Sequence, residues 1–319
     1  MIFYLNKKER EEINKLIETK YYNDEIADYI NECVLNKTFQ KEFLNNVDIK
    51  PLNINKYIND EYYRSIFVKT FKRDNCELNY DKYKPYQVFL YDDLSVDEED
   101  YYLIYNHLGY FKEAYKFLAL KKDNVTWMSI IPHEINTMQK LLNDKEEIYI
   151  FGLGLGYYPF FLKSKKITII DNDKDIIRIF KENILPQFKN KESINIINDD
   201  AFSYLKNINK EAYIFIDLWH NHQDGLMLYY KLKKALQKQQ HVFYWLEENI
   251  IASFRHLLID LIEEELYHHN EYDYKTARED NDIIINKLHH YFIDKKINSY
   301  REIKELLKSD NLKKLIVDI

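Results

Sequence analysis

Glycine and cysteine are both scarce in this chain of 319 residues, which contains five glycines and two cysteines. The cysteines, Cys33 and Cys76, lie far apart and form no metal-ligand pattern, so we expect free thiols in a reducing compartment. Three of the five glycines, Gly152, Gly154 and Gly156, stand at alternate positions directly after a short apolar run. A chain with so little glycine is expected to use it where the backbone geometry requires it.

Long apolar runs are absent as well. No stretch of about 18 consecutive apolar residues occurs in the sequence, so it offers no candidate for a membrane-spanning helix. The first residues, MIFYLNKKEREEI, lack the apolar core of a secretory signal peptide. From these two features we expect a cytoplasmic protein with no membrane partner.

The chain also lacks an excess of positive charge. Its formal net charge is −7, which argues against a general nucleic-acid binder, so we expect a small-molecule or protein partner instead. Hydrophobic residues make up 46% and charged residues 31% of the sequence, a balance typical of a globular protein with an apolar core.

The residues around the three glycines predict a strand, a loop and a helix in succession. Residues 148–151 are β-branched or aromatic, as in a buried strand. Residues 157–162 contain Pro159, which is well tolerated in the first turn of a helix. A loop of this kind leaves unpaired N–H groups at a helix N-terminus, and these attract an anionic or polar ligand group.

After the glycine loop, apolar strands alternate with helices. The predicted strands are residues 148–151, 166–171, 193–198, 212–217 and 241–246, and the predicted helices are residues 157–162, 173–183, a short helix from 201, 223–239 and 249–268. This order indicates right-handed crossovers and an α/β fold with a doubly wound, mainly parallel sheet. Ligands of such sheets bind outside the carboxyl ends of the strands.

The flanking segments are predicted to be mostly helical. Helical apolar spacing occurs in residues 6–19, 24–35 and 59–71, and residues 86–91 form one short strand. Ser95 and Glu98 form a capping box that predicts a helix over residues 100–108, and Ser299 and Glu302 form a second one. We therefore predict a mostly helical N-terminal domain (1–122), a Rossmann-like domain (123–270) and a helical C-terminal extension (271–319).

Polar residues follow the predicted strands at their carboxyl ends. Asp171 comes about 20 residues after Gly152, the spacing at which an acid accepts hydrogen bonds from ribose hydroxyls. Asp199 and Asp200 follow the third strand, and Asp217 ends the fourth. Because these ends meet at one edge of a parallel sheet, the pattern predicts a cofactor that contains a nucleoside.

The glycine spacing separates two classes of cofactor. A dinucleotide loop requires Gly-x-Gly-x-x-Gly, which would place glycine at position 157, where the chain has Tyr157. The alternate glycines, the acid after the second strand and the Asp-Ala pair after the third together resemble the class I S-adenosylmethionine-dependent methyltransferase superfamily. The resemblance covers about residues 148–249.

This resemblance implies S-adenosylmethionine as the cofactor and assigns its contacts residue by residue. The glycine loop would lie under the methionine and ribose portions, and Asp217 would begin the segment that faces the reactive methyl group. The implied cofactor contacts are Gly152, Gly154 and Gly156 in the loop, Asp171 at the ribose hydroxyls, Asn172 beside the adenine, and Asp200 with Ala201 at the adenine edge and face.

The candidate catalytic residues are Asp217, Trp219 and His220. Histidine titrates near neutrality, so His220 is a candidate base, and Trp219 could stack on a planar or cationic acceptor. The alternative is structural, with Trp219 in the core and His220 hydrogen-bonded in a loop. The segment lacks both prolines of the amino-methylating signature, and Ile150 stands where many members have an acid, so the acceptor stays open.

Three further features are weaker. His220, His222 and Asp224 could offer ligands from one loop, but without other support we predict no metal site. His133 and Glu134 could close over the cofactor, with Pro132 favouring a turn before them. The two strands that usually complete the family's sheet are not evident after residue 271.

Two rival functions remain open. The chain also resembles the spermidine-synthase-like branch, which transfers an aminopropyl group to a polyamine. The carboxylates that could surround such an acceptor are Asp173, Asp199, Asp217, Asp224, Glu247 and Glu248. The second rival is a non-catalytic protein that retains the fold and associates through its tyrosine-rich N-terminal region, for which a homodimer is one possible assembly.

Overall fold

A parallel sheet of five strands forms the centre of the fold. The computed structural model describes residues 1–19, 24–41, 44, 48–219, 222–268 and 280–319. The strands are β11 (Glu147–Phe151), β12 (Lys166–Asp171), β13 (Ile194–Asn198), β14 (Tyr213–Ile216) and β15 (His241–Tyr244), and their order is β13-β12-β11-β14-β15. The five predicted strands are thus confirmed, and the order reverses between β11 and β14, which is the switch point of the sheet.

Helices connect these strands, as the alternating pattern predicts. They are α6 (Tyr157–Phe161), α7 (Lys174–Asn183), α8 (Ala201–Leu205), α9 (His222–Ala235) and α10 (Glu247–Glu263), and α10 continues into a π-helical turn, Glu264–His268. Short 3₁₀ turns at Leu185–Gln187 and Lys191–Ser193 follow α7. Aspartates that follow β12 and β13 cap the next helices: Asp173 accepts a hydrogen bond from the N–H of Asp175 in α7, and Asp200 accepts one from the N–H of Ser203 in α8.

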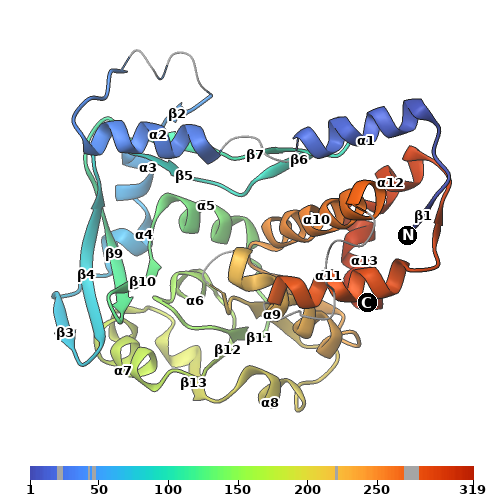
Figure 1. Cartoon of the computed structure of the whole chain (residues 1–319). Coiled ribbons are helices and arrows are strands. Elements are labelled where there is room, and N and C mark those ends of the chain that lie inside the picture. Colours follow the sequence, from blue (N-terminus) through green and yellow to red (C-terminus); the bar gives the residue numbers. More distant parts are fainter. Residues whose placement is uncertain (20–23, 42–43, 45–47, 220–221, 269–279) are drawn as a thin grey trace.

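Residues 1–122 are not mostly helical, so that prediction is wrong. Four helices, α1 (Lys7–Thr19), α2 (Asp24–Leu35), α3 (Ile54–Ile58) and α4 (Glu61–Ser65), are followed by antiparallel strands. The strands from residue 71 onwards are β3 (Phe71–Arg73), β4 (Cys76–Tyr83), β5 (Val88–Leu90), β6 (Ser95–Asp97), β7 (Leu103–Tyr105), β8 (Leu108–Tyr110), β9 (Tyr115–Lys122) and β10 (Val125–Ser129). A four-stranded sheet, β10-β9-β4-β3, stands on one flank of the molecule (Figure 1).

Two segments that were predicted to be helical show why the prediction fails. The helix predicted over residues 59–71 ends at Ser65, because Ile66 is already extended (ψ 110°). The Ser95 and Glu98 pair does not cap a helix but lies in the β6–β7 hairpin, where Asp97 accepts from the N–H groups of Glu99 and Asp100. Glu98 instead binds residues far away in the sequence, and local spacing cannot reveal such a partner.

The C-terminal residues are mainly helical, as predicted. They form α11 (Asp280–Phe292), α12 (Tyr300–Leu306) and α13 (Ser309–Asp318), and Ser299 caps α12 by accepting from the N–H of Glu302 at 3.3 Å. The short strand β16 (Lys296–Ile297) pairs with β1 (Ile2–Phe3), so neither extends the five-stranded sheet. These helices lie on the flank opposite to the antiparallel sheet (Figure 1).

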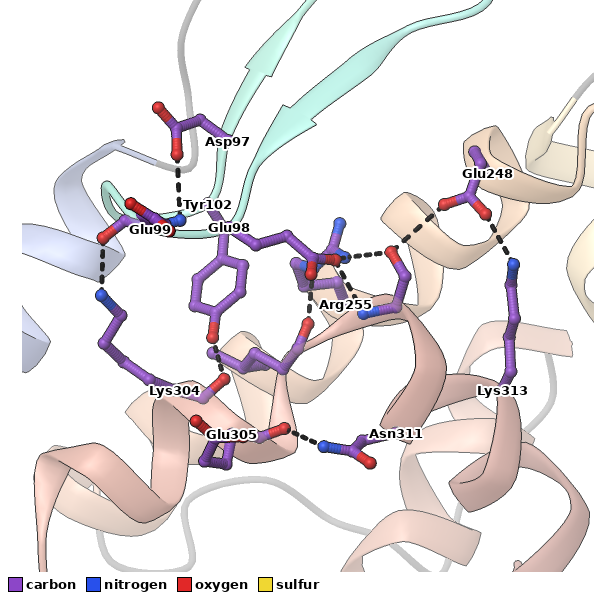
Figure 2. A network of polar contacts seen from close by, with 12 residues as sticks. Asp97, Glu98, Glu99, Tyr102, Glu248, Arg255, Lys304, Glu305, Asn311 and Lys313 are labelled. Atoms are coloured by element: carbon purple, nitrogen blue, oxygen red, sulfur yellow. Dashed lines mark hydrogen bonds and ion pairs between the residues drawn. The ribbon is translucent and has the colours of Figure 1, made fainter.

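Arg255 of α10 joins the C-terminal helices to the β6–β7 hairpin (Figure 2). Its side chain is 1% exposed, and it donates to the Leu307 carbonyl at 2.8 Å and to the Glu98 carboxylate at 3.1 Å. The same Glu98 oxygen accepts from the N–H of Ser309 at 2.8 Å. One buried guanidinium and one carboxylate therefore link α10, the start of α13 and the hairpin.

One hydrophobic core contains side chains from all three predicted parts, including Leu16, Ile150 and Ile303. The boundaries at residues 122 and 270 stay a prediction. Among the described residues, no helix combines the length and the apolar character needed to span a bilayer.

Candidate functional site

A cavity of about 470 Å³ lies at the carboxyl ends of β11, β12 and β14. Its volume is within the range of small-molecule sites in proteins. The parallel sheet and its loops contribute Gly152, Leu153, Gly154, Asp171, Asn172, Asp173, Asp199, Asp200, Ala201, Asp217 and Trp219 to its lining. Sequence reasoning thus predicted the position of the cavity, which is the switch point of the sheet.

The glycine loop has backbone angles that side chains rarely adopt. Gly152 has φ 97°, and a Cβ atom there would lie 1.7 Å from the carbonyl oxygen of Asp217. Gly154 has φ 52°, and a Cβ atom there would lie 2.0 Å from the Met128 sulfur. Gly152 is therefore required by contact with the main chain of Asp217, and Gly154 is favoured by its positive φ, since the Met128 side chain can move. Gly156 does not line the cavity and is the N-cap residue of α6.

Asp171 ties the glycine loop to the end of β12. One carboxylate oxygen accepts from the N–H of Leu153 at 2.9 Å, and the other accepts from the N–H of Asp173 at 2.8 Å. Burial raises the pKa of Asp171, and these two hydrogen bonds oppose that rise. The two bonds hold the carboxylate at the cavity wall, next to the main chain of the loop.

The residues predicted to contact adenine lie on the outer side of the cavity. Asn172 and Asp200 are exposed, and Ala201 is the first residue of α8. All three line the cavity, together with Asp199. The structure therefore brings together every predicted cofactor residue except Gly156.

Asp217 is the least satisfied polar group of the site. Its Oδ1 atom is buried and has no hydrogen-bond partner. Burial, together with the negative charge of Asp171, raises the pKa of Asp217 to about 8. The carboxyl is therefore largely protonated at neutral pH.

Glu134 lies on the other side of Asp217, in α5 (Pro132–Leu141). It is 7% exposed, and burial first, then the charge of Asp217, raise its pKa well above the usual value. The two carboxyls line a second cavity of about 10 Å³. Neither His133 nor Glu134 lines the cavity of about 470 Å³, and Pro132 starts a helix where a turn was expected.

Trp219 has the structural role that sequence reasoning kept as an alternative. It is 5% exposed, and its indole N–H donates to the carbonyl of Trp245 at 3.1 Å. It forms part of the cavity wall from within the core. His220 lies outside the described residues, and so does the side chain of His222, so of the suggested metal loop only Asp224 is described in full. Within the described part of the chain, no group of three or more potential ligand side chains is arranged for a metal ion.

Three lining residues come from the antiparallel sheet, and sequence reasoning missed all of them. Lys122 ends β9, and Trp127 and Met128 belong to β10. Lys122 forms an ion pair with Asp173, and Met128 covers Gly154. No local signal in the sequence places these residues at the cavity, because they reach it only through the pairing of β4, β9 and β10.

Comparison with known proteins gives a fold likeness only. No family model matches this chain, and neither does any curated protein. Among the solved structures that match is spermidine synthase from Thermotoga maritima, with 14% sequence identity and a TM-score of 0.30. The match covers 40% of this chain and 50% of that chain, so it spans about half the length of the enzyme. A superposition of that quality identifies neither a family nor an activity.

Proposed function

We propose that this protein is an S-adenosylmethionine-dependent methyltransferase acting on a small-molecule or protein acceptor. The observation that carries the proposal is the hydrogen bond from the N–H of Leu153 to the Asp171 carboxylate. This bond places an acid of the kind that binds ribose hydroxyls next to a glycine loop, at the switch point of a parallel sheet.

The residues of the cavity fit an adenosyl sulfonium. A carboxylate has about four acceptor positions, and Asp171 uses two of them on main-chain N–H groups, which leaves capacity for two hydroxyls. The lining contains five aspartates and one lysine. Asp217 is largely protonated and Lys122 pairs with Asp173, and the three other carboxylates favour a ligand with positive charge. When bound, the cofactor would supply an electrophilic methyl group on its sulfonium, and the protein would orient the acceptor towards it.

Aminopropyl transfer is the second candidate, favoured by the same acidic lining. Several carboxylates suggested for a polyamine are, however, already neutralised within the protein. Lys122 pairs with Asp173, and Lys313 pairs with Glu248 at 2.6 Å and with Glu247 at 3.4 Å. Because a polyamine would have to displace these lysines, methyl transfer is the first proposal.

Isothermal titration calorimetry tests the cofactor. Purified protein is expected to bind S-adenosylmethionine or its demethylated product with a dissociation constant in the micromolar range. Gly154→Val should abolish this binding, because a β-branched residue is strained at φ 52° and would displace the Met128 side chain at the cavity wall. Absence of binding of either ligand by the unaltered protein would refute the proposal.

A transfer assay separates the two enzyme candidates. Decarboxylated S-adenosylmethionine with putrescine is compared with S-adenosylmethionine and a panel of amine, hydroxyl and protein acceptors. Product formation only with the decarboxylated cofactor would replace methyl transfer by aminopropyl transfer. Tight binding without turnover in either arm would favour a non-catalytic protein that retains the fold.

A further inference from the structure

Helix α4, from the N-terminal part of the chain, contacts the glycine loop directly. Tyr62 is 1% exposed, and its hydroxyl donates a hydrogen bond to the main-chain carbonyl of Leu155. Leu155 lies between Gly154 and Gly156 and is itself buried. Neither Tyr62 nor Leu155 lines the cavity of about 470 Å³, so this contact supports the loop from outside the site.

A second contact follows two residues further along the loop. The hydroxyl of Tyr157, the first residue of α6, donates to Asp60 at 2.9 Å, and Gln139 of α5 donates to the same carboxylate oxygen at 3.1 Å. The other oxygen of Asp60 accepts from the N–H groups of Tyr62 and Tyr63 and so caps α4. One buried carboxylate therefore joins the start of α4 to the helix that follows the glycine loop.

The helices that make these contacts are themselves anchored. In α3, Lys56 donates to the side-chain oxygen of Asn136 at 2.6 Å, and the Asn136 amide donates to the Tyr57 hydroxyl at 3.1 Å. Asn136 belongs to α5, which also supplies Gln139. The Asn136 bonds hold α3 against α5, and the bond from Gln139 to Asp60 holds the start of α4 against α5. Helix α5 therefore restrains the position of α4 beside the glycine loop.

Inside the loop, the N–H of Gly156 donates to the carbonyl of Leu153 at 3.0 Å, and the five-residue helix α6 that follows has no side-chain cap. A buried carbonyl that loses its partner is expected to turn towards another donor or water. Rotation of the Leu155–Gly156 peptide would turn the Gly156 N–H away from the Leu153 carbonyl and so release the main chain at Leu153, which lines the cavity.

We propose that Asp60 and Tyr62 are positioning residues for the ligand-binding glycine loop, fixing its main chain from the side opposite to the ligand. The identity of the ligand rests on the proposed function above. The positioning role itself is a statement about the loop and can be measured without any ligand.

The first experiment measures amide hydrogen exchange by mass spectrometry in the ligand-free protein. Tyr62→Phe and Asp60→Asn are compared with the unaltered chain. Asparagine retains a side-chain oxygen for the cap of α4 but places an amide where the Tyr157 and Gln139 donors point. Exchange in peptides that span residues 153–157 should accelerate by about tenfold or more in both variants, while peptides from β12 and β13 stay unchanged.

Tyr115→Phe is the matched control. Tyr115 is also a fully buried tyrosine, and its hydroxyl has no hydrogen-bond partner. Removal of that hydroxyl should leave exchange in the glycine loop as it is in the unaltered protein. Uniform acceleration across the whole chain, or unchanged exchange at residues 153–157 in Tyr62→Phe and Asp60→Asn, would overturn the proposal.

The second experiment measures affinity for the demethylated product by calorimetry, at a temperature where every variant is folded. Tyr62→Phe should weaken binding by about tenfold, and Tyr115→Phe should not change it. A lower melting temperature with unchanged affinity would show that Tyr62 only supports the fold. If the unaltered protein binds no adenosyl ligand, the proposed function fails, and the exchange experiment still decides the positioning role.

Discussion

The two walls of the cavity are built in different ways. The wall from the parallel sheet is fixed by the main chain: Gly152 lies against the Asp217 carbonyl, and Asp171 accepts two N–H groups. The wall from the antiparallel sheet consists of the side chains of Lys122, Trp127 and Met128. A substitution in the first wall must move the backbone. A substitution in the second wall can change ligand binding and leave the fold intact.

The largest effect is expected from Gly152→Ala, which tests the main-chain wall. Its Cβ would lie 1.7 Å from the Asp217 carbonyl oxygen, at φ 97°, so β11 and β14 must separate. We expect a loss of about 3 kcal/mol or more in the free energy of unfolding, measured by urea titration, and no ligand binding.

Gly225→Ala is the control for this variant. Gly225 lies in α9, and its nearest contacts to an added Cβ are side-chain atoms at 3.1 Å. A change within about 1 kcal/mol is expected, because the gain in helix propensity offsets a small clash. If Gly152→Ala were as mild as Gly225→Ala, the main-chain wall would not be rigid.

The next effect concerns the buried carboxyl of Asp217. Its pKa is about 8 in the folded protein, against an ordinary value of 3.8. Below pH 3.8 the carboxyl is neutral in both the folded and the unfolded chain, and its full contribution to the free energy of unfolding is present. Between pH 3.8 and about 8 the unfolded chain ionises first, so stability falls as the pH rises, by up to about 1.4 kcal/mol per pH unit.

Asp217→Asn should therefore match the unaltered protein near pH 4 and exceed its unfolding free energy increasingly up to pH 8. Urea titrations at pH 4, 6 and 8 measure the difference. The groups that face Asp217 are Asp171 and Glu134, and Glu134 keeps part of the pH dependence because its own pKa is raised. A difference that does not grow with pH would contradict the buried, unpartnered state of Asp217.

The contrast between the two cavity walls also explains which parts of the fold and of the site could be predicted from the sequence. The apolar runs of β11 to β15 are separated by helices. The glycine loop follows β11, and aspartates lie at or just after the ends of β12, β13 and β14. The sheet and the residues at its switch point therefore follow from local patterns. Asp171 and Asp200 were found in this way. The neutral state of Asp217 was not, because it depends on the burial of this carboxyl and on the nearby charge of Asp171, and both arise only when the chain folds.

The antiparallel wall could not be predicted for a different reason. Residues of β4 and β9 pair across about 40 positions of sequence, for example Leu78 with Leu120, and such pairing leaves no local period that marks the partner. The capping box at Ser95 and Glu98 was misleading, since Glu98 binds the distant Arg255. Lys122, Trp127 and Met128 therefore had no signal that placed them at the site.

The smallest effect is expected from Lys122→Met, which tests the side-chain wall. Burial raises the pKa of Asp173, but hydrogen bonds from Lys122 and from two N–H groups of α7 outweigh it, so the net pKa is lowered. A group with a lowered pKa stabilises the fold above its ordinary value of 3.8 and loses that effect as the pH falls. At pH 7 the variant should lose about 1 kcal/mol or less, because the N–H bonds to Asp173 remain.

Ligand binding distinguishes the role of Lys122 from that of its neighbour on β9. Lys121 pairs with Asp81 at 3.2 Å and does not line the cavity, so Lys121→Met is the matched control. S-adenosylmethionine carries one more positive charge than its demethylated product. Removal of the Lys122 charge from an aspartate-lined cavity should therefore strengthen binding of the sulfonium relative to the product by about fivefold, as measured by calorimetry, and Lys121→Met should leave the ratio unchanged. Equal changes in both variants would mean that the charge of the antiparallel wall does not reach the ligand.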